Sequence, residues 1–347
     1  MMVGALSKYS FMNAKLRARI SEILTDEIFD QLANAPSIDA ALALLRNTAF
    51  AGLEDTYART GDLRLAELEL LKTEIGLYKG LRPYLHTNSR PLVDALLSQF
   101  EVDNLKNAIR LYFDRSIRKR DVETGAHYIL YEPILHDIPM DLIVNAGNFD
   151  EIAGLCEGTP YSRTIRKYAG TVLSEGSLFR MEVALDQDYY RDLLSAVRNL
   201  SSEDRKVALR LIGVEIDLQN ISWIIRFKQF YDLPLEAVRA ALIPGGFKLS
   251  ASLIEELYRA ESVSSVLQEF VKGSYPGLSA LLSSLTSDST SRLILIGRIL
   301  EEIKKYEVQH ILAGYPFTVG IILAYFLLKN DEMKRIRTLL NTKYYGK

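Results

Sequence analysis

Residues that could bind a metal or act as acids and bases are poorly combined in this sequence. Glu307 and His310 have the Glu-x-x-His spacing of di-iron bundles, which need two such pairs and two more inward-facing glutamates. The other glutamate–histidine pairs are spaced by four residues instead, at Glu123 and His127 and at Glu132 and His136. We therefore expect surface or capping roles for these side chains, and no metal.

An enzymatic alternative rests on the acidic segment 26–30, which resembles the aspartate-rich magnesium motif of all-helical prenyl synthases. No second acidic motif complements it. Thr25 as the cap of a short helix with acids in its first turn explains the same letters. Cys156 lies beside an apolar stretch, as a small core residue would. The sequence also lacks H-E-x-x-H, G-x-S-x-G and phosphate-binding glycine loops. We expect no catalytic residue and no cofactor.

Composition limits the remaining function classes. The chain has 347 residues, 48% of them apolar, with 42 Lys and Arg against 44 Asp and Glu. A net charge of −2 gives no basic field for nonspecific phosphate binding, so we expect no nucleic acid partner. A single cysteine excludes an intrachain disulfide and fits a reducing compartment. The first residues lack a signal-peptide pattern, and the longest apolar run, 317–328, is shorter than the roughly 20 residues of a membrane span. We expect that run to be a buried helix.

Apolar residues recur at helical intervals over long windows, as from Leu65 to Leu81, whereas strand alternation is scarce. Asp62 and Ser201 stand where helix caps are expected, and Pro91 where a first-turn proline is expected. The sequence therefore predicts an all-α fold.

One pattern appears three times. Residues 35–50, which end in Phe50, align with 146–161, which end in Tyr161, at a constant shift of 111, and a looser copy ends in Tyr275. Each copy is typical of two short helices with a Ser or Asn cap between them.

A second pattern follows each copy of the first. Glu101, Asn104 and Arg110 align with Asp217, Asn220 and Arg226 at a shift of 116. A weaker third set begins at Glu332, with Arg335 where the others have Asn. A period near one third of the chain means that the repeating unit is a whole helical bundle. We expect three modules, 1–120, 121–238 and 239–347, arranged as quasi-equivalent bundles around a pseudo-threefold axis, with a funnel along it.

Recurring polar residues are the candidate partner contacts. Asn104 with Arg110, and Asn220 with Arg226, could face the proposed axis and grip a partner, or could bond an adjacent helix end. Two basic groups could dock to an acidic partner or stabilise a helix C-terminus. They are Arg115, Arg118, Lys119 and Arg120, and, near the end of the chain, Lys334, Arg335 and Arg337.

These features resemble the C subunit of the bacterial and archaeal rotary V/A-type ATPases, which is the equivalent of the d subunit of the eukaryotic V-ATPase. The resemblance covers essentially the whole chain. It rests on an opening with Tyr9, Asn13 and Arg17, on the segment from Phe100 to Arg110, and most specifically on the ending from Pro316 to Arg337. The family usually has Asn where Arg335 stands.

The resemblance implies a non-catalytic, funnel-shaped socket of three bundles. The central shaft, made of the D and F subunits, would seat in it, and its other end would stand on the membrane ring of proteolipid subunits. Such a chain would transmit torque for proton or sodium transport, and would lie in the cytoplasm, peripheral to the inner face of the cell membrane. The alternative is a soluble all-helical adaptor unrelated to rotary motors.

Overall fold

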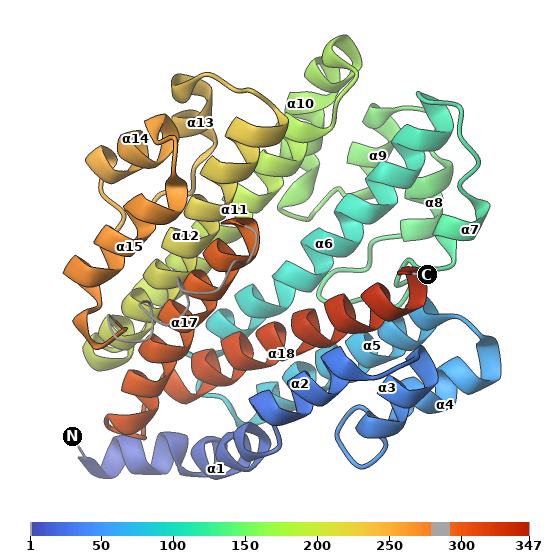
Figure 1. Cartoon of the computed structure of the whole chain (residues 1–347). Helices are drawn as coiled ribbons and strands as arrows, with labels where there is room; N and C mark the ends of the chain where they lie inside the picture. The colour runs from blue at the N-terminus through green and yellow to red at the C-terminus, as the bar shows by residue number, and fades with distance from the viewer. Residues whose placement is uncertain (1, 279–291, 347) are drawn as a thin grey trace. The chain divides into compact units, whose positions relative to one another are not determined.

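The computed structural model describes residues 2–278 and 292–346, and within these ranges every regular element is a helix (Figure 1). The helices up to residue 116 are α1 (Met2–Ser21), α2 (Asp26–Asn34), α3 (Ile38–Leu45), α4 (Ala51–Thr60), α5 (Leu63–Leu81), η1 (Arg82–Tyr84) and α6 (Arg90–Ser116). Those up to residue 230 are α7 (Glu123–Ala126), α8 (Met140–Asn145), α9 (Phe149–Leu155), α10 (Tyr161–Glu175), α11 (Phe179–Arg198) and α12 (Ser202–Phe230). The rest are α13 (Leu235–Ala241), α14 (Ala251–Arg259), α15 (Val263–Ser274), η2 (Pro276–Leu278), α17 (Arg292–Ala313) and α18 (Gly320–Tyr345). The all-α prediction is confirmed.

The chain forms two compact units. One comprises residues 1–14 and 197–328, and the other comprises 15–196 and 329–347. The chain passes between the units inside α1, α11 and α18. The boundaries of these units do not coincide with those of the three predicted modules, which lie after residues 120 and 238. The three modules and their pseudo-threefold arrangement stay a prediction.

Local capping follows the sequence in most places. Asp62 accepts hydrogen bonds from the first amides of α5, and Ser201 accepts one from Asp204 N at the start of α12. In the first repeated pattern, Ser37 and Asn148 cap α3 and α9 in the same way.

Thr25 occupies the N-cap position of α2, with Asp26 and Glu27 in the first turn as predicted, but its side chain makes no hydrogen bond to the helix. Asp26, in the first turn of the same helix, instead pairs with Arg335 of α18 at 2.9 Å. The acidic start of α2 is therefore held by a long-range ion pair.

The apolar run 317–328 leads into α18. Its residues from Val319 to Leu327 are buried, as expected of a core helix. Among residues 2–278 and 292–346, no helix is long and apolar enough to cross a membrane.

The last part of α18 packs on helices from the start of the chain. Met333, Ile336 and Leu340 share one buried apolar cluster with residues of α2, α3, α4 and α5. Burial of these side chains stabilises the packing of α18 on the four helices, since apolar area removed from water contributes roughly 25 cal/mol per Å².

Candidate partner-binding surfaces

Each of the three longest helices in the described parts of the chain, α6, α12 and α18, carries a buried carboxylate. On α6 this is Glu101, whose side chain is 1% exposed. One oxygen accepts hydrogen bonds from Leu135 N and His136 N, both at 2.8 Å. The other contacts His136 Nδ1 at 2.6 Å and accepts a bond from Tyr161 Oη at 2.8 Å. Glu101 therefore fixes the segment that follows α7 and the start of α10 to one point on α6.

Asp217 on α12 is surrounded in a related way. It accepts bonds from Phe247 N at 3.0 Å and Lys248 N at 2.5 Å. Lys248 Nζ lies 3.7 Å from the ring centroid of Tyr275. Burial raises the pKa of Asp217, and the backbone bonds from Lys248 and Phe247 oppose that rise. A β-carbon on Gly246 would lie 2.0 Å from Asp217 Oδ1, so only glycine leaves room for the carboxylate here.

Glu332 on α18 forms the third cluster. It accepts a bond from Leu24 N at 2.7 Å and pairs with Lys329 at 2.9 Å. Lys329 Nζ lies 4.2 Å from the ring centroid of Phe50. Each cluster thus joins a carboxylate of the second repeated pattern to the aromatic residue that ends the first pattern. We name these three groups, centred on Glu101, Asp217 and Glu332, the anchor clusters.

The anchor clusters reveal a pairing that the repeats alone do not. Glu101 of α6 contacts Tyr161, and the cluster around Asp217 of α12 includes Tyr275. Each of these two aromatic residues therefore joins the cluster on the copy of the second pattern that precedes it in the chain. No copy of the second repeated pattern precedes Phe50 in the chain. Phe50 instead contacts Lys329 of the last helix, α18. The pairing is therefore cyclic along the sequence.

The two asparagines of the second repeated pattern bind the backbone. Asn104 Nδ2 donates to Leu130 O and its Oδ1 accepts from Leu130 N. Asn220 makes the same two bonds with Ile243. Both side chains are buried, so these bonds match the structural alternative, in which the asparagines hold a neighbouring segment. At the third position Arg335 stacks on Phe29, 3.7 Å from the ring centroid, as well as pairing with Asp26.

The arginines of the same repeat differ from each other. Arg110 forms a two-bond pair with Glu182 of α11, at 2.6 and 3.0 Å. Arg226 is exposed on α12. Near the chain end, Arg337 lies 3.3 Å from Glu67 and Lys334 is exposed. A partner contact at any of these positions stays a prediction.

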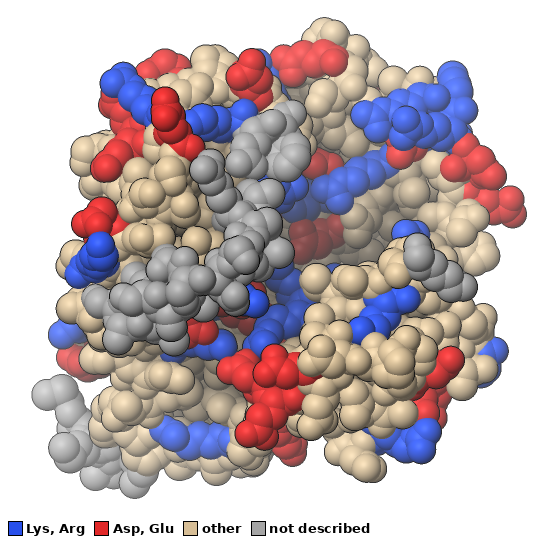
Figure 2. Space-filling model, in the orientation of Figure 1, with Lys and Arg blue, Asp and Glu red and all other residues tan. Residues whose placement is uncertain are grey.

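The side chains of the basic run at the end of α6 differ in the contacts that they make. Arg115 donates to Val144 O and Ala146 O at 3.0 and 2.7 Å, which caps the C-terminus of α8. Arg118 and Arg120 lie 3.1 and 3.7 Å from Asp114. Lys119 is exposed and has a left-handed backbone, with φ of 56°. In Figure 2 Lys and Arg gather over the region where Figure 1 draws this end of α6.

A hollow of about 600 Å³ lies beside this run, lined among others by Arg115, Arg120, His127 and Tyr131. Its walls also carry Asp121, Glu123 and Asp141, so its charge is mixed. Burial, and then the charge of Asp141, raise the pKa of Tyr131.

The residues that first suggested chemistry lie in ordinary structural settings. The prediction of a surface or capping role is wrong for Glu307, which is buried and pairs with Arg210 of α12 at 2.7 Å, whereas His310 is exposed. Cys156 is buried, and burial raises the pKa of its thiol to about 12. The described ranges contain no cluster of three His, Cys, Asp or Glu side chains that could hold a metal ion.

Comparison with known proteins decides the family. The family model described as ATP synthase (C/AC39) subunit matches residues 12–347. This chain belongs to that family. Curated relatives agree: the C subunit of the A-type ATP synthase of Methanosphaera stadtmanae is 24% identical, over 96% of this chain and 84% of the relative. The C subunits of the A-type ATP synthases of Pyrococcus horikoshii and Methanococcoides burtonii are 26% and 25% identical, over 95% and 98% of this chain and 85% and 91% of theirs. The family resemblance read from the sequence is thereby confirmed.

Membership of the C/AC39 family also gives the anchor clusters a setting. They lie on the long helices that the repeats identified, and the bonds described in them are internal to the chain. They therefore stabilise the fold of an ATP synthase subunit. The candidate contacts to other proteins are the exposed Lys and Arg side chains described above.

Proposed function

We propose that this chain is the non-catalytic coupling element of a rotary ATPase or ATP synthase. In this role it is a socket that receives the shaft of D and F subunits and stands on the proteolipid ring at the inner face of the cell membrane. The match of residues 12–347 to the C/AC39 family carries the proposal. The recurrence of one anchor cluster on each of α6, α12 and α18 supports a body built from three related bundles.

A coupling element has to be stiff. Packed helical cores have low compressibility, so they transmit strain instead of absorbing it. The anchor clusters add fixed points between each long helix and a segment distant in sequence, such as α18 and Leu24. Stable attachment at each end also requires roughly 1,200–2,000 Å² of buried surface.

The direct test is binding to the two proposed partners. Purified chain is mixed with the D–F pair and, in a separate experiment, with the detergent-solubilised proteolipid ring, and complex mass is followed by light scattering. We expect a complex with each. A chain that stays monomeric with both would refute the proposal and favour the alternative, a helical adaptor unrelated to rotary motors.

The basic run supplies a second prediction. Reversing charge with Arg118→Glu, Lys119→Glu and Arg120→Glu should weaken binding to one of the two partners by on the order of tenfold, and mostly at low salt. Charges at an interface rim are screened beyond about 10 Å at 0.1 M salt, so the difference should shrink as salt rises.

The matched control reverses three exposed cations elsewhere, with Arg59→Glu, Arg90→Glu and Lys206→Glu. It makes the same change in net charge and should bind like the wild type. If both variants bind both partners with equal affinity, the basic run does not contact a partner, and its role is to stabilise the C-terminus of α6.

A further inference from the structure

We propose that the outer face of α10, together with the groove between α10 and α11, is a docking surface for a helix of a partner subunit. The partner helix would present two carboxylates one turn apart and an apolar side chain about two turns further on. This inference rests on the proposed function, because it assigns one contact of the assembled complex.

The face is a continuous exposed strip on one side of α10. Its buried side holds Tyr161, Ile165 and Val172. Residues at helical spacing on the opposite side are all exposed: Arg163, Arg166, Lys167, Gly170, Leu173 and Ser174. The strip therefore changes along the helix from cationic, through small, to apolar.

Two of the three cations on this strip form no ion pair with another residue that the structure describes. Arg166 pairs with Glu157 at 2.7 Å. Within the described parts of the chain, Arg163 and Lys167 form no ion pair, although Lys167 Nζ lies 5.0 Å from the ring centroid of Tyr168. Arg163 and Lys167 are four residues apart, hence one turn apart, which matches carboxylates at the same spacing on a partner helix.

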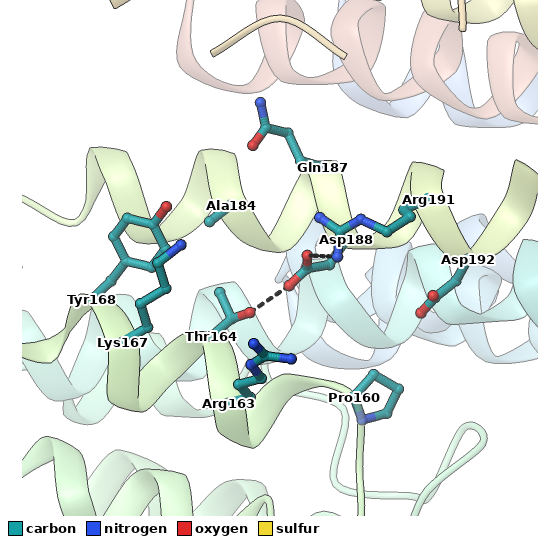
Figure 3. A pocket seen from close by; sticks show the side chains of 10 residues that line it. All are labelled: Pro160, Arg163, Thr164, Lys167, Tyr168, Ala184, Gln187, Asp188, Arg191 and Asp192. Atoms are coloured by element: carbon teal, nitrogen blue, oxygen red, sulfur yellow. Dashed lines mark hydrogen bonds and ion pairs between the residues drawn. The ribbon is translucent and has the colours of Figure 1, made fainter. Parts of the chain in front are cut away.

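The groove adjoins these cations. It has a volume of about 360 Å³, and Figure 3 shows Arg163 and Lys167 reaching from α10 while Asp188, Arg191 and Asp192 come from α11. Asp188 is already bound, since it accepts a bond from Thr164 and pairs with Arg191 at 2.6 Å. Burial, and then the charge of Asp188, raise the pKa of Asp192. Asp188 is thus compensated inside the groove, whereas Arg163 and Lys167 on the α10 wall form no ion pair among the described residues, so this wall can attract an anionic group.

Gly170 and Leu173 point to a close helical contact. Glycine inside a helix costs about 1 kcal/mol relative to alanine. Nothing within the described chain requires it here, because a β-carbon at Gly170 would have no heavy atom within 4 Å. The missing side chain lets a second helix approach closely, and Leu173, at 57% exposure, offers that helix an apolar contact.

The test uses a single introduced thiol in the whole complex. Gly170→Cys is placed in the full chain, and the ATPase is purified from membranes through a tag on another subunit. The rate of maleimide labelling is then compared with that of the free variant. Native Cys156 adds little background because it is buried. We expect labelling in the complex to be at least tenfold slower than in the free chain.

A charge variant supplies the second readout. Arg163→Glu with Lys167→Glu should restore labelling of Gly170→Cys in the complex, or reduce recovery of the chain with it, whereas the control pair Arg59→Glu with Arg90→Glu should do neither. Equal labelling of the free and complexed Gly170→Cys chain, with normal recovery, would overturn the docking surface and leave the proposed function intact. A wild-type chain that does not co-purify with the ATPase would overturn both.

Discussion

Replacing Glu101 by alanine is expected to destabilise the unit that contains α6 by about 3 kcal/mol. The change leaves three buried or half-buried donors without their acceptor: Leu135 N, His136 N and Tyr161 Oη. Each buried donor that loses its partner costs roughly 1–3 kcal/mol, and water entering the vacated space recovers part of that. A cavity left by the carboxylate side chain adds to the loss.

Hydrogen exchange provides the local measurement. A loss of about 3 kcal/mol corresponds to roughly a hundredfold faster exchange where opening controls the rate, and the amides of Leu135 and His136 should show it first. Glu132→Ala is the matched control, because its side chain is 71% exposed and its contact with Lys72, at 3.4 Å, lies on the surface. It should change stability by less than about 0.5 kcal/mol.

A double-mutant cycle separates the network from simple loss of volume. Tyr161→Phe alone should cost about 1 kcal/mol, since it removes one hydrogen bond to the Glu101 side chain. In the Glu101→Ala background the same change should cost close to nothing, because that bond is already absent. Additive costs would show that Tyr161 and Glu101 are not coupled.

The repeats could be predicted from the sequence because they depend on residue types at fixed spacing. Asp62 and Ser201 were predictable as caps for the same reason, since a cap acts on amides two or three residues away. The ion pair at the start of α2 was not predictable, because the partner of Asp26 is Arg335, which is over three hundred positions distant in the sequence.

The pairing of the copies lay beyond sequence reasoning. Spacing shows that Phe50, Tyr161 and Tyr275 are equivalent, but it does not say which long helix each one meets. Adjacent position in the chain favours α6 as the partner of the first copy, whereas the fold gives that copy to α18. A signal was present in the carboxylates of the second repeated pattern, which recur among apolar residues, because a buried acid requires donors from somewhere.

The exposed candidates show the opposite difficulty. Arg118, Lys119 and Arg120 could be recognised as a basic run. Which of them form ion pairs depends on the position of Asp114 and on the backbone turn at Lys119. Arg163 and Lys167 gave no comparable signal, because two cations four residues apart are common on helices. The lack of an ion pair at both positions, within the described ranges, is a property of the fold.

Replacing Asp204 by alanine should be as damaging to the other unit, at about 3–5 kcal/mol. Asp204 joins three parts of the chain. It pairs with Lys8 at 2.9 Å, accepts bonds from Tyr9 Oη and Ser201 Oγ at 2.8 Å, and accepts one from Val319 N at 3.0 Å. Its loss leaves a largely buried lysine and several donors without this acceptor, so the first half of α1 should detach from the start of α12.

The same carboxylate sets a pH dependence. Burial by itself would raise the pKa of Asp204, but the bonds from Lys8, Tyr9, Val319 and Ser201 outweigh it and hold the pKa below its ordinary value. A group whose pKa is lower in the folded chain stabilises the fold above its unfolded pKa, about 3.9, and loses that contribution as pH falls through the folded pKa. Wild-type stability should therefore drop more steeply below about pH 4 than that of Asp204→Asn.

Urea unfolding between about pH 3 and pH 7, with hydrogen exchange of residues 8–14, measures both effects. The neighbouring Glu203→Ala is the control, because Glu203 is an exposed acid in the same first turn of α12 and contributes only through the helix dipole. If Asp204→Ala and Glu203→Ala unfold at the same urea concentration, the carboxylate at position 204 does not hold α1 in place. A parallel fall in the stability of Asp204→Asn and of the wild type with acid would instead show that Asp204 is not the source of the pH dependence.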